Sequence, residues 1–211
     1  MGYIRIVSTY ISKLEFIDMN SSHNNKTVFG GNLQMPEYKG LQSFPGRYRK
    51  YLDFIAKVLV KLKTDRPDRS GLLNWMKNKY KLTSASSARS YLQNILALGL
   101  IVDRQDGLYP SGIGEKFLEN KKERQEIIFE ALVSSFAGFQ EIVVFLYDKN
   151  EASIGELHEM LEKSFAFHWK TTSQTSRRLS WLKALGYAET VSKRAVLTVE
   201  GRKAAARLLS L

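Results

Sequence analysis

Cysteine is absent from the 211-residue sequence, which excludes disulfide bridges and thiolate metal sites and is compatible with a reducing compartment. The three histidines do not have the spacing of metal ligands. The longest purely apolar run, residues 142–147, is far shorter than the roughly 20 residues that span a bilayer. Residues 1–12 lack the apolar segment of a signal peptide. We therefore expect no membrane segment and a cytoplasmic location.

Catalytic motifs are also missing. The sequence has no Gly-rich phosphate loop ending in Gly-Lys-Ser or Gly-Lys-Thr, and no His-Glu-x-x-His zinc motif. A metal-dependent nuclease needs clustered carboxylates that hold a divalent ion near the scissile phosphate. Glu37 and Lys39 have the E-x-K form and Pro67-Asp68 has the P-D form, but their order is reversed. The sequence thus predicts no active site and no bound cofactor in this chain.

Acidic residues are few relative to basic ones. There are 32 Lys and Arg against 21 Asp and Glu, a net charge of +11. Residues 163–211 hold ten of the bases and only two acids, and residues 170–188 contain no acid. A localised positive charge favours a polyanionic partner such as nucleic acid. A solvated basic surface that serves only solubility is the alternative.

An internal repeat becomes visible when the sequence is shifted by 87 residues. Residues 92–116 (LQNILALGLIVDRQDGLYPSGIGEK) then align without a gap with residues 179–203 (LSWLKALGYAETVSKRAVLTVEGRK). Identities at one fixed offset indicate two copies of one structural unit. The matched positions include Leu92 with Leu179, Ala97-Leu98-Gly99 with Ala184-Leu185-Gly186, Gly114 with Gly201, and Lys116 with Lys203.

Each copy predicts the same order of elements. A helix ends at a glycine, two short strands enclose a polar turn, and a Ser or Thr caps a further helix. Two more helical segments precede each copy, at residues 47–64 and 70–82 and at residues 139–149 and 153–165. Three helices and a β-hairpin are typical of a winged helix-turn-helix, and a generic α+β domain is the alternative.

The predicted fold is therefore mostly α with small β-hairpins (α+β). It consists of an irregular N-terminal arm (residues 1–46) followed by two tandem winged helix-turn-helix domains, residues 47–120 and 121–211. The three tryptophans are predicted to pack in cores or between helices rather than to stack on bases, because aromatic residues at helical spacing usually pack.

The third helix of each unit is the candidate DNA-reading element, since the second helix of a helix-turn-helix enters the major groove. Arg pairs with guanine, Gln reads adenine and Ser contacts bases or phosphates. Simple helix capping is the alternative for the first Ser and Thr residues. The candidate residues are Ser86, Arg89, Ser90 and Gln93 in the first copy, Lys170, Ser173, Ser176, Arg177, Ser180 and Lys183 in the second, and Arg104, Gln105, Lys193 and Arg194 in the two wings.

The chain resembles the DNA-recognition region of FokI-type (type IIS) restriction endonucleases. The resemblance runs through residues 28–36, 92–119, 126–161 and 176–191. It implies winged-helix recognition domains joined to a separate nuclease domain or subunit that uses Mg²⁺ and that would lie outside this sequence. It also implies that Asn32 and Gln34 in the arm contact DNA.

These observations predict a sequence-specific double-stranded DNA-binding module, the target-recognition part of a restriction endonuclease. Two alternatives stay open. One is a transcriptional regulator with tandem winged helices. The other is a protein-interaction scaffold, since winged helices also serve as docking domains and fold does not fix function.

Overall fold

The computed structural model describes residues 40–165 and 169–210. This part of the chain is mostly helical with small antiparallel sheets, so the predicted α+β class is confirmed. The first half contains η1 (Tyr48–Lys50), α2 (Tyr51–Asp65), α3 (Arg69–Lys79), α4 (Ala85–Ala97), β1 (Ile101–Arg104), β2 (Gly107–Pro110) and α5 (Gly112–Glu119). The second half contains α6 (Arg124–Ser135), α7 (Phe139–Lys149), β3 (Glu151–Ala152), α8 (Ile154–Phe165), α9 (Ser173–Ala184), β4 (Ala188–Val191), β5 (Arg194–Leu197) and α10 (Val199–Leu209).

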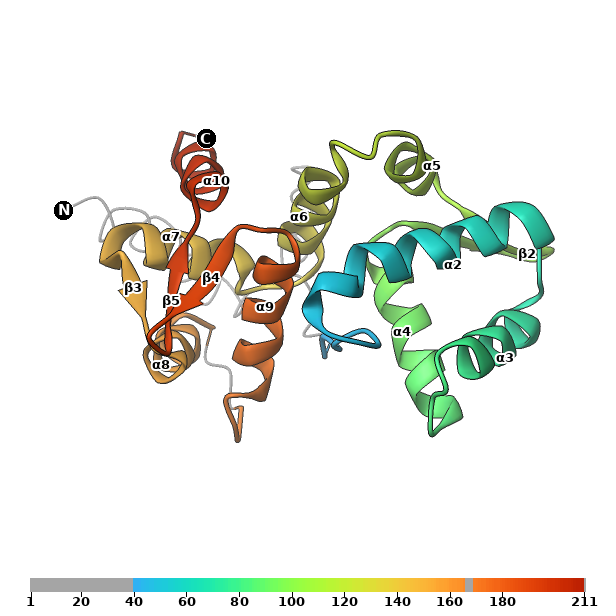
Figure 1. Ribbon diagram of the computed structural model, residues 1–211, viewed down its shortest axis with the longest axis horizontal. Coiled ribbons are helices and arrows are strands. Elements are labelled where there is room, and N and C mark those ends of the chain that lie inside the picture. The colour runs from blue at the N-terminus through green and yellow to red at the C-terminus, as the bar shows by residue number, and fades with distance from the viewer. Residues whose placement is uncertain (1–39, 166–168, 211) are drawn as a thin grey trace, which may run out of the picture.

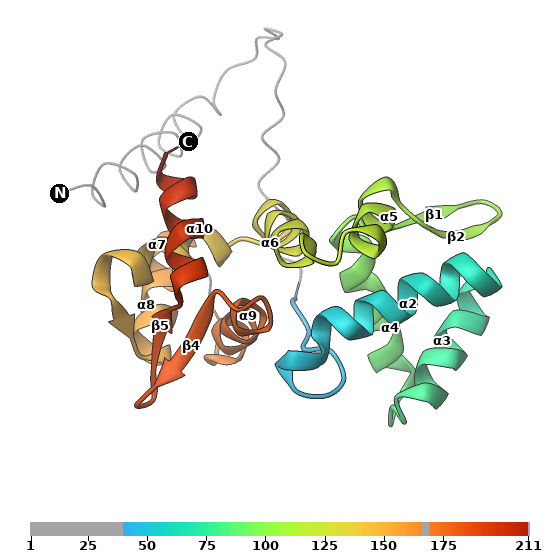
Figure 2. The same cartoon turned by 45° about the horizontal axis from the view of Figure 1, so that its top comes forward.

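The described residues form two lobes that lie side by side (Figure 1). One lobe holds α2 to α5, the other holds α7 to α10, and α6 lies between them (Figure 2). No single helix in residues 40–165 and 169–210 is long and apolar enough to cross a membrane. Only α6 and α7 taken together reach that length and composition, and they bend by 109° where they meet.

The two lobes differ in their sheets. Strands β1 and β2 pair alone, whereas β5 pairs with β4 on one side and with β3 on the other. The linker after α2 contains Arg66 in a left-handed conformation and then Pro67, which has no N–H to donate to a ladder. The linker after α7 has Asn150 at φ 68° and then Glu151 and Ala152, which can pair. The third strand was not predicted from the sequence.

The 87-residue repeat is reproduced in the backbone. Gly99 and Gly186 end α4 and α9 at φ 68° and 73°, a conformation that favours glycine. Ser111 and Thr198 cap α5 and α10 in the same way, because each hydroxyl accepts the N–H of the glycine three residues later, at 3.0 and 3.1 Å. Equivalent sequence positions therefore make equivalent hydrogen bonds.

The capped helices also approach their hairpins through glycine. A Cβ atom on Gly114 would lie 2.2 Å from the carbonyl oxygen of Leu100, and one on Gly201 would lie 1.9 Å from that of Tyr187. Leu100 and Tyr187 are again 87 residues apart. No side chain fits against a backbone atom at this distance, so the repeated glycine is required by close packing in both lobes.

A continuous core joins the lobes through residues that precede the first helix. Leu41 and Phe44 are buried, although the sequence placed residues 1–46 in an irregular arm. The Phe44 ring lies 5.7 Å from Tyr91 of α4 and 5.0 Å from Trp181 of α9, both in edge-to-face geometry. Trp181 is fully buried, as the packing prediction required. Residues 40–46 thus form part of the fold.

Candidate nucleic-acid interface

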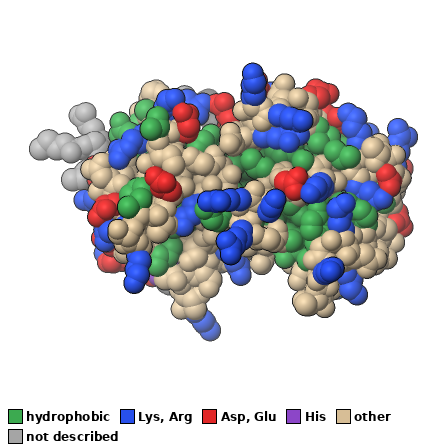
Figure 3. Space-filling view, in the orientation of Figure 1, with side chains coloured by type: hydrophobic (Ala, Val, Ile, Leu, Met, Phe, Trp, Pro, Cys, Tyr) green, Lys and Arg blue, Asp and Glu red, His purple; other side chains and the backbone are tan. Residues whose placement is uncertain are grey.

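Basic side chains are spread over both lobes on the face shown in Figure 3. Charge alone therefore does not single out a site. The exposure of each basic or polar side chain, and the partners it has within the protein, decide whether it is free to contact an external polyanion.

Helix α4 is capped by Ser84, whose hydroxyl accepts the N–H of Ser87 at 3.2 Å. Its apolar residues face the core, and Ala88, Leu92 and Ile95 are buried. On the opposite side Ser86, Arg89 and Gln93 are exposed, and Ser90 is half-buried. The predicted reading face of α4 is therefore open to solvent among the described residues.

The turn before α4 is basic and firmly anchored. Lys77, Lys79 and Lys81 are exposed, and Lys81 adopts φ 50° as the chain leaves α3. Tyr80 packs against the Phe54 ring at 4.8 Å, and burial raises the pKa of Tyr80 to about 12. The half-buried Tyr80 ring packs on the core and so holds the end of α3, with these lysines, next to the start of α4.

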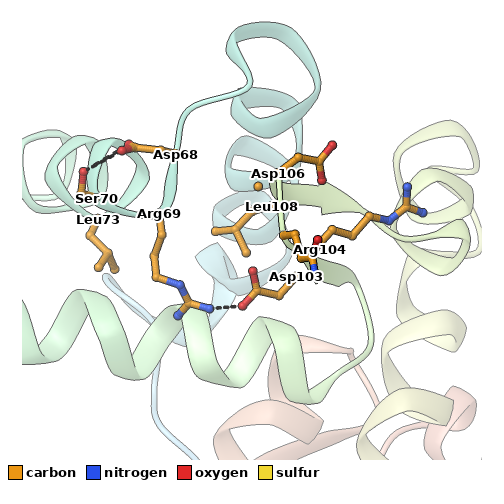
Figure 4. A pocket seen from close by; sticks show the side chains of 10 residues that line it. Asp68, Arg69, Ser70, Leu73, Asp103, Arg104, Asp106 and Leu108 are labelled. Carbon is orange, nitrogen blue, oxygen red and sulfur yellow. Dashed lines mark hydrogen bonds and ion pairs between the residues drawn. The ribbon is translucent and has the colours of Figure 1, made fainter.

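The β1–β2 hairpin carries the first predicted wing residues, Arg104 and Gln105, and both are exposed. The neighbouring acids are engaged: Asp103 pairs with Arg69, and Asp106 accepts the Tyr109 hydroxyl at 3.0 Å. The pair of Asp103 and Arg69 spans an open groove of about 500 Å³ between the hairpin and the start of α3, while the side chain of Arg104, which also lines the groove, points away from Asp103 (Figure 4). The hairpin thus presents an arginine whose acidic neighbours have other partners.

Helix α9 does not have the open face that its sequence predicted. Ser173 at its start is exposed, but Ser176, Arg177, Ser180 and Lys183 are all half-buried. Arg177 donates from Nη1 to the carbonyl oxygen of Leu41 at 3.0 Å, and η1 packs against α9. A base-reading role for Arg177 would require this contact to break. Helical periodicity locates the side facing the helix's own core, but it does not reveal a covering segment from elsewhere in the chain.

Both third helices are tied to one backbone carbonyl. Asn94 of α4 donates from Nδ2 to the oxygen of Gln42 at 3.4 Å, and Trp181 of α9 donates from Nε1 to the same oxygen at 3.2 Å. Asn94 and Trp181 are equivalent in the repeat, being 87 residues apart. Equivalent faces of the two helices therefore meet at residues 40–46, a junction that was not predicted from the sequence.

Comparison with known proteins gives no match among family models, curated proteins or solved structures. The resemblance to FokI-type recognition regions therefore stays a prediction. A function for this chain has to be inferred from its own geometry.

The second hairpin offers less positive charge than its sequence suggests. Lys193 lies exposed at the turn, at φ 67°. Arg194 pairs with Glu151 at 2.8 Å and with Glu156 at 3.0 Å. Hydrogen bonds from Ser153, together with Arg194, lower the pKa of Glu156, so this carboxylate stays charged. Of the two predicted wing residues, only Lys193 is positioned for an external anion.

Much of the basic charge in residues 163–211 is similarly engaged within the protein. Arg178 is buried, donating to the carbonyl oxygens of Ala137 at 2.8 Å and Gln174 at 3.2 Å. Arg207 pairs with Glu126. The excess of bases in the second half, which favoured this half as the polyanion surface, therefore overstates its external field. Lys170 and Lys193 remain exposed.

In the parts of the chain that the structure describes, no group of three or more His, Asp or Glu residues could hold a metal ion. Asp68 of the P-D motif caps α3, accepting the N–H of Gly71 at 2.7 Å. Glu37, Lys39 and the arm residues Asn32 and Gln34 lie outside the described residues.

Proposed function

We propose that this chain is a double-stranded DNA-binding module built from two winged helix-turn-helix units, and that α4 is its base-reading helix. The observation that carries the proposal is the open face of α4. It combines Ser86, Arg89 and Gln93 on one exposed side of a helix that a lysine-rich turn precedes. The α2–α3–α4–β1–β2 order, with the third helix exposed, supports the winged helix-turn-helix arrangement.

The chemistry of this face suits the major groove. The Arg89 guanidinium can donate two hydrogen bonds to guanine, and the Gln93 amide can both donate to and accept from adenine. Lys77 and Lys81 supply positive charge for phosphates, contacts that position a protein on the duplex without reading sequence. Arg104 on the hairpin adds a further phosphate or minor-groove contact beside α4.

Helix α9 plays a different part in this proposal. Its middle is occupied by residues 41–51, so it holds the two lobes together, and it reaches DNA only through its exposed start and the Lys193 hairpin. One reading helix and one structural helix predict a short, asymmetric target rather than a palindrome. An asymmetric target is consistent with the target-recognition part of a restriction endonuclease, in which a separate domain or subunit would supply Mg²⁺-dependent cleavage. A palindromic footprint from a dimer would instead indicate a transcriptional regulator.

Selection of bound sequences from random duplexes tests the proposal. We expect an enriched asymmetric site. We also expect the affinity to fall steeply as the salt concentration rises, because binding releases cations from the DNA phosphates and added salt opposes that release. Gln93→Ala should relax the base preference at one position of the site. Gln125 is also exposed but lies on α6, so Gln125→Ala should leave the base preference unchanged at every position. Absence of duplex binding at low salt would contradict the proposal.

A further inference from the structure

A second candidate surface lies between α2 and α3. An open groove of about 300 Å³ separates these helices, and its floor is formed by Ala56, Val60 and the Trp75 ring. Val60 is 48% exposed although it lies in the middle of α2. In Figure 3 apolar side chains gather in this part of the molecule, with Lys and Arg side chains around them. We refer to this surface as the Trp75 groove.

Three lysines form the rim of the Trp75 groove. The Nζ atoms of Lys61 and Lys79 lie 5.8 and 5.3 Å from the centre of the Trp75 ring, within cation–π range. Lys57 completes the rim. A half-buried tryptophan with two cations near its ring is thus held beside an apolar floor.

The rim lysines can accept external carboxylates. Lys57 pairs with Asp53, and Lys61 pairs with Asp65 on the same helix. Exposed pairs of this kind contribute only about 0.3–0.5 kcal/mol, so a bound carboxylate can replace them. Lys79 has no carboxylate within salt-bridge distance among residues 40–165 and 169–210. Three lysines against the two carboxylates of Asp53 and Asp65 leave the rim with an excess of one positive charge.

We propose that the Trp75 groove docks an acidic peptide, with an apolar side chain on the floor and carboxylates on the lysine rim. The volume, at the lower limit for ligand sites, suits one or two side chains rather than a whole small molecule. The Thr64 hydroxyl, the only hydroxyl in the lining, donates to the Val60 carbonyl at 3.1 Å and is not free to donate to a ligand. Apolar contact between flanking charges is the chemistry of an amphipathic acidic segment.

The Trp75 groove lies apart from α4, although Lys79, one of the lysines before α4, also lines it. None of its lining residues belongs to α4, and α2 crosses in front of α4 in Figures 1 and 2. Helix α3 provides a matched pair of residues, since Lys77 and Lys79 are both exposed in its last turn but only Lys79 lines the groove. The two proposals can therefore fail independently.

The experiment measures fluorescence anisotropy of a labelled peptide in which a Phe-Leu pair stands between two runs of glutamate, titrated with the full chain. Lys79→Ala should weaken binding about fivefold or more, and Lys77→Ala less than about twofold, because only one of these lysines reaches the bound carboxylates. Val60→Glu should weaken binding about tenfold by placing a charge on the floor. A peptide with Ser-Ser in place of Phe-Leu should lose a similar factor, since the apolar burial is removed.

Equal effects of Lys77→Ala and Lys79→Ala, or equal binding of the Ser-Ser peptide, would overturn the proposal by showing attraction to net charge alone. Labelled oligothymidine serves as the competing probe. If it binds in a manner sensitive to Lys79→Ala and Val60→Glu while the peptide does not, the groove takes single-stranded nucleic acid and the peptide proposal is wrong. Retained duplex binding by Val60→Glu would show that the variant is folded and that the DNA face is intact.

Discussion

Helices α4 and α9 occupy the same place in two copies of one unit, yet one is open and the other is covered. Both end at a left-handed glycine, and both precede a hairpin and a hydroxyl-capped helix. Both helices contact this segment through Gln42, but on α9 it also takes up Arg177, which lies on the predicted reading face. Local sequence thus sets the helix and its caps, whereas a distant segment decides whether the outer face is open to solvent or covered. The equivalent positions are Ser86 and Ser173, Arg89 and Ser176, Ser90 and Arg177, Gln93 and Ser180, and Asn94 and Trp181.

The largest expected effect on stability comes from a substitution in the covered helix, α9. Trp181→Ala should lower the free energy of unfolding by about 3–5 kcal/mol, because it empties a site packed against Phe44 and Tyr51. Gln93→Ala on the open side should change it by less than about 0.5 kcal/mol. Urea unfolding followed by circular dichroism measures both values. A loss below about 1 kcal/mol for Trp181→Ala would show that the junction between the lobes contributes little.

Substitutions at the repeated glycines test whether the two lobes are packed in the same way. Gly114→Ala and Gly201→Ala should each destabilise the protein by about 1–3 kcal/mol, since the new methyl group meets a backbone carbonyl. Gly112→Ala is the matched control, because a Cβ there meets nothing within 4 Å and the residue begins α5. The control should be neutral or slightly stabilising in thermal unfolding. Tolerance at only one of the two repeated positions would mean that the lobes are packed differently.

Two arginines test the functional side of the comparison. On the selected duplex, Arg89→Ala should weaken binding by about 1–3 kcal/mol through loss of a base contact. Arg177→Ala should change DNA affinity little at matched salt and should instead lower stability by about 1 kcal/mol, through loss of its bond to Leu41. Electrophoretic mobility shift and urea unfolding separate the two effects. The opposite result, with Arg177 essential for affinity, would place α9 in the groove.

The smallest expected effect concerns phosphate contacts. Lys81→Ala should reduce the slope of log affinity against log salt concentration by about one unit, with no change in the preferred sequence. Arg202→Ala removes an equal charge from the exposed side of α10 and serves as the control, for which an unchanged slope is expected. Binding titrations over a series of salt concentrations measure both slopes. Equal slopes for both variants would remove the α3–α4 turn from the interface.

The sequence predicted the elements but not their partners. The spacing of apolar residues, the glycine ends and the Ser and Thr caps are local properties, so α4, α9 and both hairpins were found where they occur. The burial of Trp181 was also predicted correctly. The contact of Arg177 joins residues 136 positions apart, and the pairing of Arg194 depends on a strand that begins far upstream, at Glu151. Such contacts arise only when the chain folds back on itself, and one sequence carries no periodic signal for them.

The backbone oxygen of Gln42, which accepts a hydrogen bond from each lobe, limits where the chain can be cut to make fragments. We expect that neither helical unit folds stably on its own when the chain is cut directly before its first helix. A fragment beginning at residue 47 would lack Leu41 and Phe44, so Trp181 would lose its contact with Phe44 and its N–H would lose the Gln42 carbonyl. A stably folded truncated form should therefore begin upstream of Leu41 and include both units. Residues 40–46, before the first helix, contact both units.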